Sequence, residues 1–266
     1  KQAIDYLTKS FIISRNASVA NNLAKAYYTA DMPDKAIKLY IEALKTEEND
    51  DIYYSLGLAY KKTGDLQSAI RSYHSALDQN PGNYSACYNL ALAYNDTGDI
   101  KSAIEYAEKC AILRKDDESL YGVLSGFYEQ TGDYKKSVKA LEKAAALNPD
   151  NFLYFYNMAV LNAMTGNDDK AVYNYLKAIS LNPNHIESYV NLANLVKKED
   201  SDKAVQYLLQ AYQINPKEEK LLLSLAQTYK DMYKNAESIK LLRELLLSNP
   251  LCDEAYSLLA MNYMDT

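Results

Sequence analysis

The sequence is poor in glycine, proline and cysteine, and each shortage narrows the choice of fold. Only 8 glycines and 6 prolines occur among 266 residues, and β-branched residues form no alternating runs bounded by turns. Strands therefore have little support, whereas helix formers dominate, so we expect an all-α protein. The 3 cysteines, Cys87, Cys110 and Cys252, are too few and too scattered for a disulfide framework. We expect them to be small buried side chains.

The chain also lacks long apolar runs and an excess of positive charge. No stretch approaches the roughly 20 apolar residues that cross a bilayer, so we expect no membrane insertion. The net charge is −6. This argues against a nucleic-acid partner, because non-specific affinity for nucleic acid comes from Lys and Arg side chains that neutralise phosphates. No targeting signal opens the chain, so the compartment stays open, with the cytoplasm as the favoured expectation.

Residues with catalytic or metal-binding chemistry are equally scarce. The only 2 histidines, His74 and His185, have neither a second histidine four residues away nor a cysteine pair beside them. No metal site is therefore predicted. The nucleophile motif GxSxG and the phosphate loop GxGxxG are absent, and the Asp116-Asp117 pair falls in an expected turn. We predict no catalytic residue, no cofactor and no enzyme activity for this chain.

The sequence does contain a repeat of 34 residues. Glycine recurs within similar four-residue turns at Gly64, Gly98, Gly132 and Gly166, each 34 residues after the last. Asn-Pro pairs show the period independently, with spacings of 68, 34, 33 and 34, and begin at Asn80, Asn148, Asn182, Asn215 and Asn249. A fixed period of this length is typical of solenoid proteins.

Each repeat is predicted to form two helices, as residues 50–83 illustrate. The apolar and small residues there follow helical spacing in two segments: Tyr53, Leu56, Gly57 and Tyr60, then Ala69, Tyr73 and Ala76. Gly64 suits the left-handed end of the first helix, and Asp65 can cap the second. Pro81 ends the second helix because it cannot continue one.

This pattern resembles that of the tetratricopeptide repeat (TPR) family over essentially the whole chain. The resemblance implies a right-handed superhelical α-solenoid of about seven complete helix-turn-helix units, with half a unit at each end. We place the complete units at residues 17–49, 50–83, 84–117, 118–151, 152–185, 186–218 and 219–252. The partial units at 1–16 and 253–266 carry no polar capping helix. We therefore expect residues 1–266 to be a single solenoid and a segment of a larger protein.

Two units depart from the pattern inside their helices. Asn162 and Val196 stand where the other units have a tyrosine, namely Tyr27, Tyr60, Tyr94, Tyr128, Tyr229 and Tyr263. The unit at 186–218 is one residue short and has no glycine turn, so we expect a local change of superhelical pitch there.

In the TPR family the first helix of each unit lines a concave groove that holds an extended peptide or a partner's helix. At about 100° per residue, the packing positions leave the opposite side of the helix to Asp51, Tyr54, Ser55, Leu58 and Lys62. The same offsets in the other units select the predicted groove residues: Asn22, Tyr54, Ser55, Tyr88, Asn89, Tyr156, Asn157, Asn191 and Asn194.

The chemistry of these groove residues favours peptide binding. An asparagine amide both donates and accepts, so a row of amides can hold the backbone of an extended peptide without selecting its side chains. Tyrosines add apolar faces with polar tips. The Asn-Leu pairs that begin at Asn89 and Asn191 resemble the asparagine ladder in the TPR arm of O-linked N-acetylglucosamine transferases, a binding arm rather than a catalytic domain. The alternative is an ordinary solvated helix face.

The predicted function is a scaffold for protein-protein interaction that binds an extended peptide or partner segment in the groove. One alternative is a TPR arm that recruits substrates for a larger enzyme, such as a glycosyltransferase. Another is self-association through the uncapped ends, where Phe11, Ile12 and Ile13 lie next to the missing first helix. A clamp for a C-terminal carboxylate is not expected, because Lys25 is the only central cation of the groove.

Overall fold

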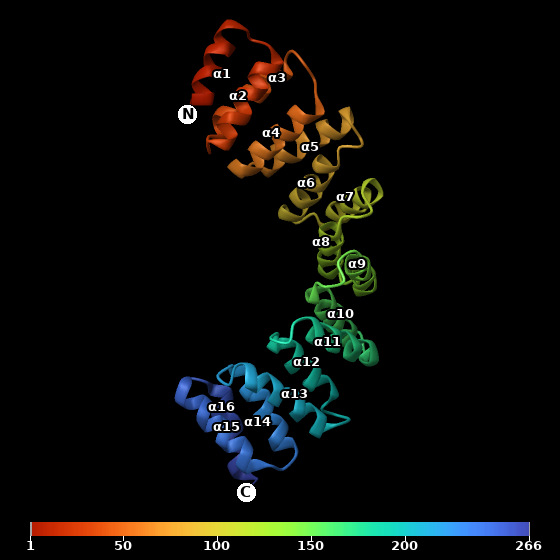
Figure 1. Cartoon of the computed structure of the whole chain (residues 1–266), viewed down its shortest axis with the longest axis vertical. Coiled ribbons are helices and arrows are strands. Elements are labelled where there is room, and N and C mark those ends of the chain that lie inside the picture. The colour runs from red at the N-terminus through yellow and green to blue at the C-terminus, as the bar shows by residue number, and fades with distance from the viewer. Residues whose placement is uncertain (1, 266) are drawn as a thin grey trace. The chain divides into compact units, whose positions relative to one another are not determined.

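The computed structural model describes residues 2–265, and these residues fold into α-helices without a strand (Figure 1). The helices are α1 (Gln2–Ile13), α2 (Ala17–Thr29), α3 (Pro33–Leu44), α4 (Asp50–Thr63), α5 (Leu66–Gln79), α6 (Tyr84–Asp96), α7 (Ile100–Leu113), α8 (Glu118–Gln130), α9 (Tyr134–Leu147), α10 (Phe152–Met164), α11 (Asp168–Leu181), α12 (Ile186–Val196), α13 (Ser201–Ile214), α14 (Glu219–Asp231), α15 (Asn235–Ser248) and α16 (Asp253–Met264). The prediction of an all-α helical repeat is confirmed.

The helices pack in sequential pairs, each made of a first and a second helix. The pairs α2–α3, α4–α5, α6–α7, α10–α11, α12–α13 and α14–α15 have the most extensive contacts. Each pair falls inside one predicted unit. The second helix of a pair also packs on the first helix of the next, as α5 does on α6 and α11 on α12. The first helices α2, α4, α6, α12 and α14 are therefore each held between two second helices.

The chain divides into two compact units, and the boundary lies between Ser137 and Val138. The first unit contains α1 to α8, and the second contains α10 to α16. The boundary falls within α9, after its first turn.

A left-handed residue ends the first helix of most pairs. Gly64 has φ +83° at the end of α4, and the next residue, Asp65, accepts a hydrogen bond from the Ser68 amide and so caps α5. The turn persists where glycine is missing, since Asp31 has φ +61° and Tyr233 has φ +59° at the equivalent positions. These two turns carry strain that the packing of their helix pairs must offset.

Small residues and tyrosines together form the core of each helix pair. Tyr40, Tyr73 and Tyr175 of the second helices are almost fully buried. A Cβ atom added at Gly57 would lie 2.4 Å from the Tyr73 ring, which explains glycine where other first helices have alanine or serine. The three cysteines are buried and unpaired, as predicted. None of the helices between residues 2 and 265 is long and apolar enough to cross a bilayer.

Candidate functional site

In the first unit, the first helices form a surface on which two predicted groove residues meet. The Asn89 amide of α6 donates to the Tyr54 hydroxyl of α4 at 3.5 Å and to the Ser85 carbonyl of its own helix at 3.0 Å. The Tyr54 ring lies 6.1 Å from that of Tyr73, which is buried beneath it. Consecutive first helices are thus linked by a tyrosine and an asparagine. We call the surface formed by the first helices of a unit its first-helix surface.

The second unit repeats this arrangement. The Asn191 amide of α12 donates to the Tyr156 hydroxyl of α10 at 3.2 Å, and the Tyr156 ring lies 6.2 Å from the buried Tyr175 ring. Burial raises the pKa of Tyr54 and of Tyr156, so both hydroxyls stay protonated at neutral pH. Each asparagine uses its amide nitrogen in the pair, which leaves the amide oxygen to accept a further hydrogen bond.

The remaining predicted groove residues have different surroundings. Ser55 is a polar neighbour of the Tyr40 hydroxyl, and burial, partly opposed by Ser55, raises the pKa of Tyr40 to about 12. The Tyr88 ring stacks on that of Tyr84 at 6.1 Å. Asn194 accepts a hydrogen bond from Ser224 at 2.9 Å. The last two predicted residues, Asn22 and Asn157, are exposed and form no side-chain hydrogen bond within residues 2–265.

A recess of about 200 Å³ opens on the first-helix surface of the second unit. Tyr156 and Asn191 line it together with Ile186 and Val190, and charged side chains surround it: Glu187, Glu218 and Lys220. Sequence reasoning did not single out these charges. Glu187 and Lys220 occupy the offset that Asp51 occupies in its own unit, so the helical-face rule could have found them.

His185 supports the recess from behind. Its ring meets Tyr156 edge-on at a centroid distance of 4.7 Å and lies 4.9 Å from Phe152. Its Nδ1 atom lies 2.8 Å from the Ser188 hydroxyl. The residue lies in the turn before α12, where it packs against the Tyr156 ring.

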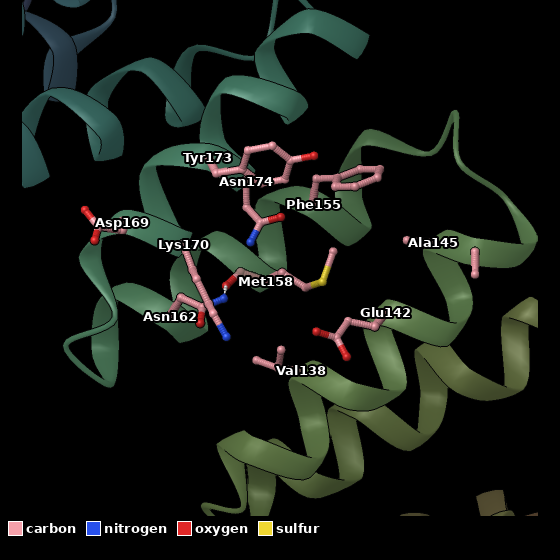
Figure 2. Close-up of a pocket in the computed structure, with 11 residues that line it drawn as sticks. Val138, Glu142, Ala145, Phe155, Met158, Asn162, Asp169, Lys170, Tyr173 and Asn174 are labelled. Carbon is pink, nitrogen blue, oxygen red and sulfur yellow. Dashed lines mark hydrogen bonds between the residues drawn. The ribbon is translucent and has the colours of Figure 1, made fainter.

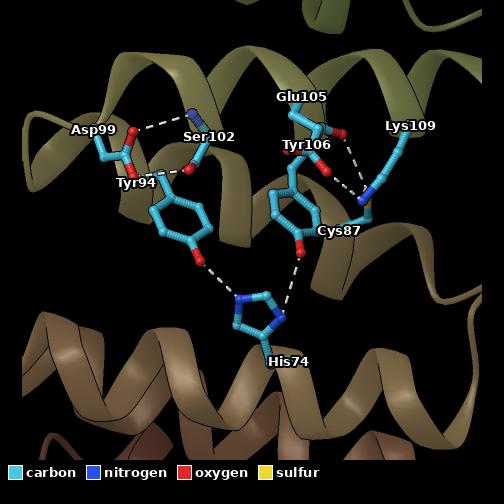
Figure 3. Close-up of polar contacts among 8 residues, drawn as sticks. All are labelled: His74, Cys87, Tyr94, Asp99, Ser102, Glu105, Tyr106 and Lys109. Carbon is cyan, nitrogen blue, oxygen red and sulfur yellow. Dashed lines mark hydrogen bonds and ion pairs between the residues drawn. The ribbon is translucent and has the colours of Figure 1, made fainter.

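The other histidine, His74, belongs to a packed polar cluster in the first unit (Figure 3). Its Nε2 atom lies 2.8 Å from the Tyr94 hydroxyl and its Nδ1 atom 3.4 Å from that of Tyr106, so one nitrogen donates and the other accepts. The two tyrosine rings stack at 5.6 Å, and the Lys109 ammonium lies 4.3 Å from the Tyr106 ring centre. Burial lowers the pKa of His74, so its ring is neutral at pH 7.

This cluster offers no nucleophile. The thiol of the nearby Cys87 is bonded to the Tyr106 carbonyl at 3.2 Å. The described part of the chain also holds no group of three or more His, Cys, Asp or Glu side chains that could bind a metal ion.

Comparison with known families agrees with this geometry. Three models, each described as a tetratricopeptide repeat, match residues 54–118, 118–151 and 195–261. The chain is a tetratricopeptide repeat protein. A search of curated proteins found no match.

Solved TPR structures resemble the chain as well. The crystal structure of MamA protein is 28% identical, with a TM-score of 0.58 over 63% of this chain and 92% of that chain. The C-terminal part of a TPR repeat-containing protein from Cytophaga hutchinsonii is 20% identical, with a TM-score of 0.73 over 84% of this chain and 93% of that one. YrrB, described as a TPR protein with an unusual peptide-binding site, is 17% identical, with a TM-score of 0.58 over 71% of this chain and 97% of its own. At 20% and 17% identity, the similarity to the Cytophaga hutchinsonii protein and to YrrB shows a shared fold alone.

Proposed function

We propose that this TPR chain is a protein-interaction scaffold whose first-helix surface binds an extended peptide. The observation that carries the proposal is the repeated pair of a tyrosine and an asparagine, Tyr54 with Asn89 and Tyr156 with Asn191. In each pair the hydrogen bond holds the asparagine amide in place, and the amide oxygen can accept a further hydrogen bond. A peptide backbone that passes over the surface would meet pre-oriented acceptors for its N–H groups, which lowers the entropy lost on binding.

The recess beside Asn191 adds selectivity to this backbone recognition. Its walls combine the Tyr156 ring with the aliphatic Val190 side chain, so it suits an apolar side chain of the peptide. Glu187 and Glu218 outnumber Lys220 around it, which favours a peptide with a positive charge next to that apolar residue. We infer no catalytic role, because the surface presents amides, aromatic rings and exposed charges without a paired nucleophile and base.

Selection from a random peptide library on the intact chain tests the proposal. We expect selected peptides to lose about tenfold in affinity for Asn191→Ala, since one hydrogen bond to a fixed amide contributes on the order of 1.4 kcal/mol. Helicity should stay unchanged, because alanine favours helix.

Gln210→Ala is the matched control, because it removes an exposed amide from α13, a second helix. Equal losses for Asn191→Ala and Gln210→Ala, or no loss for either, would overturn the assignment of the first-helix surface.

Self-association is a second candidate, favoured by exposed apolar side chains on α1. Ile12 is 73% exposed and Ile13 is 86% exposed. Light scattering over a wide concentration range tests it, and a constant monomer mass would exclude it. A third candidate is a TPR arm that recruits substrates for an enzyme in the same polypeptide. Sequencing the complete reading frame tests it, because the frame would then also encode a catalytic domain.

A further inference from the structure

A cleft of about 560 Å³ lies between α9, α10 and α11 in the second unit, away from the first-helix surface (Figure 2). Phe155 and Met158 give it apolar walls, and the cleft also contains Glu142, Asn162 and Lys170. This volume is within the range of sites that take small molecules or inserted side chains. It lies in the unit where Asn162 replaces the usual tyrosine.

In three other repeats the tyrosine at this position reaches the preceding second helix. Its hydroxyl meets the residue twenty positions earlier: Tyr94 meets His74 at 2.8 Å, Tyr128 donates to Glu108 at 2.5 Å, and Tyr263 accepts from Arg243 at 2.7 Å. The residue twenty positions before Asn162 is Glu142, which corresponds to Glu108 in the repeat pattern. Its carboxylate projects into the cleft (Figure 2).

In two repeats a lysine lies over the ring of the tyrosine at this position. Lys136 lies 5.3 Å from the ring centre of Tyr128, and Lys35 lies 5.3 Å from that of Tyr27, in both cases eight residues after the tyrosine. The equivalent residue after Asn162 is Lys170, which lines the cleft. Lys170 contacts no ring and no carboxylate within residues 2–265. The cleft therefore has the carboxylate and the lysine that surround the tyrosine ring in other repeats, namely Glu142 and Lys170, but it has no ring between them.

The inner end of the cleft is polar. Asn162 is 5% exposed, and its amide donates to the Met158 carbonyl at 2.7 Å. Asn174 is 8% exposed, points into the cleft (Figure 2) and has no side-chain hydrogen bond within the described residues. It replaces Tyr106, whose ring stacks on Tyr94 in the first unit. Its amide is therefore free to bond to a group that enters the cleft.

We propose that this cleft, which we call the Asn162 cleft, binds a tyrosine side chain of a protein partner. The ring would fill the space that Tyr128 fills in its own unit, with its hydroxyl donating to Glu142 and its face against Lys170. Asn174 supplies a further polar contact to the partner's backbone. The Asn162 cleft is separate from the first-helix surface, so either proposal can fail without the other.

p-Cresol, the side chain of tyrosine as a free molecule, is the direct probe. The intact chain labelled on its methionine methyl groups is titrated with p-cresol and followed by NMR. We expect a saturable shift of the Met158 methyl with Kd on the order of 1 mM, as befits so small a ligand. Toluene, which lacks the hydroxyl, should bind several-fold more weakly, and so should p-cresol to Glu142→Gln.

Asn162→Tyr should abolish the shift, because the chain's own ring then occupies the cleft. Asn184→Tyr, the same substitution in the exposed turn before α12, is the matched control and should leave it unchanged. An unmoved Met158 methyl, or equal binding by Asn162→Tyr and the unaltered chain, would overturn the proposal. A chain oligomer that Asn162→Tyr dissociates would assign the cleft to a second copy and overturn the proposal of a separate partner.

Discussion

Tyr128 and Asn162 occupy the same position in neighbouring repeats, and each has a glutamate twenty residues before it and a lysine eight residues after it. Tyr128 is 6% exposed, donates to Glu108 and lies beneath Lys136. Asn162 is just as buried, but Glu142 and Lys170 border an open cleft there. The comparison shows that a repeat can lose the side chain at the centre of a site while the groups that serve it stay in place.

The repeat architecture makes such a vacancy tolerable. Each unit is stabilised by contacts with its neighbours only, so a cavity in one unit leaves the rest of the array unaffected. An empty apolar site in a single globular core would weaken the whole domain.

The largest expected effect comes from converting the filled site into an empty one. Tyr128→Asn should lower the free energy of unfolding by about 3 kcal/mol, because it removes a buried ring and its hydrogen bond to a carboxylate. Urea denaturation of the intact chain measures the change. The control is Tyr6→Asn, since Tyr6 is 72% exposed, and it should change stability by less than about 0.5 kcal/mol. If the control lost as much free energy of unfolding as Tyr128→Asn, the buried ring and hydrogen bond of Tyr128 would not explain the loss.

A smaller difference in stability is expected between Phe variants of Tyr175 and Tyr73, two tyrosines that occupy the same position in their second helices. The hydroxyl of Tyr175 has the polar Asn191 side chain as a neighbour, whereas the buried hydroxyl of Tyr73 has no hydrogen-bond partner among residues 2–265. Tyr175→Phe should therefore cost about 1 kcal/mol, and Tyr73→Phe should be neutral or stabilising by up to about 1 kcal/mol. Thermal unfolding of the two variants compares them directly. A loss in Tyr73→Phe as large as that in Tyr175→Phe would contradict the assignment.

The smallest effect is a pH dependence confined to the His74 cluster. Burial lowers the folded-state pKa of His74 below its ordinary value of 6.5, so the unfolded chain binds the proton first as pH falls. The free energy of unfolding should decrease below pH 6.5 until the folded-state pKa is passed. Urea denaturation at several pH values should show a shallower decrease for His74→Gln. Identical profiles would show that His74 is not responsible.

Much of the fold followed from the sequence because glycine and proline mark the same period. The left-handed turns at Asp31 and Tyr233 did not, since neither residue prefers that conformation and packing imposes it. The helical-face rule selected Tyr54 and Asn89, but one helix cannot reveal that they bond to each other across two repeats.

The Asn162 cleft shows the same limit of sequence reasoning. The loss of tyrosine at position 162 was visible in the repeat alignment. Its consequence depends on Glu142 and Lys170, which lie on two other helices. Only the packing of α9 and α11 against α10 brings them to one cleft.

A double-mutant cycle between Asn162→Tyr and Glu142→Gln tests the central claim most directly, namely that the cleft is a tyrosine site lacking its ring. Asn162→Tyr alone should raise the free energy of unfolding by about 1 kcal/mol, because it fills the cleft and gains a hydrogen bond to a carboxylate. When Glu142→Gln is also present, Asn162→Tyr should lose most of the stabilisation that comes from its hydrogen bond to the carboxylate. The coupling energy between the two substitutions should therefore be at least about 0.5 kcal/mol. Destabilisation by Asn162→Tyr, or a coupling of zero, would contradict the account.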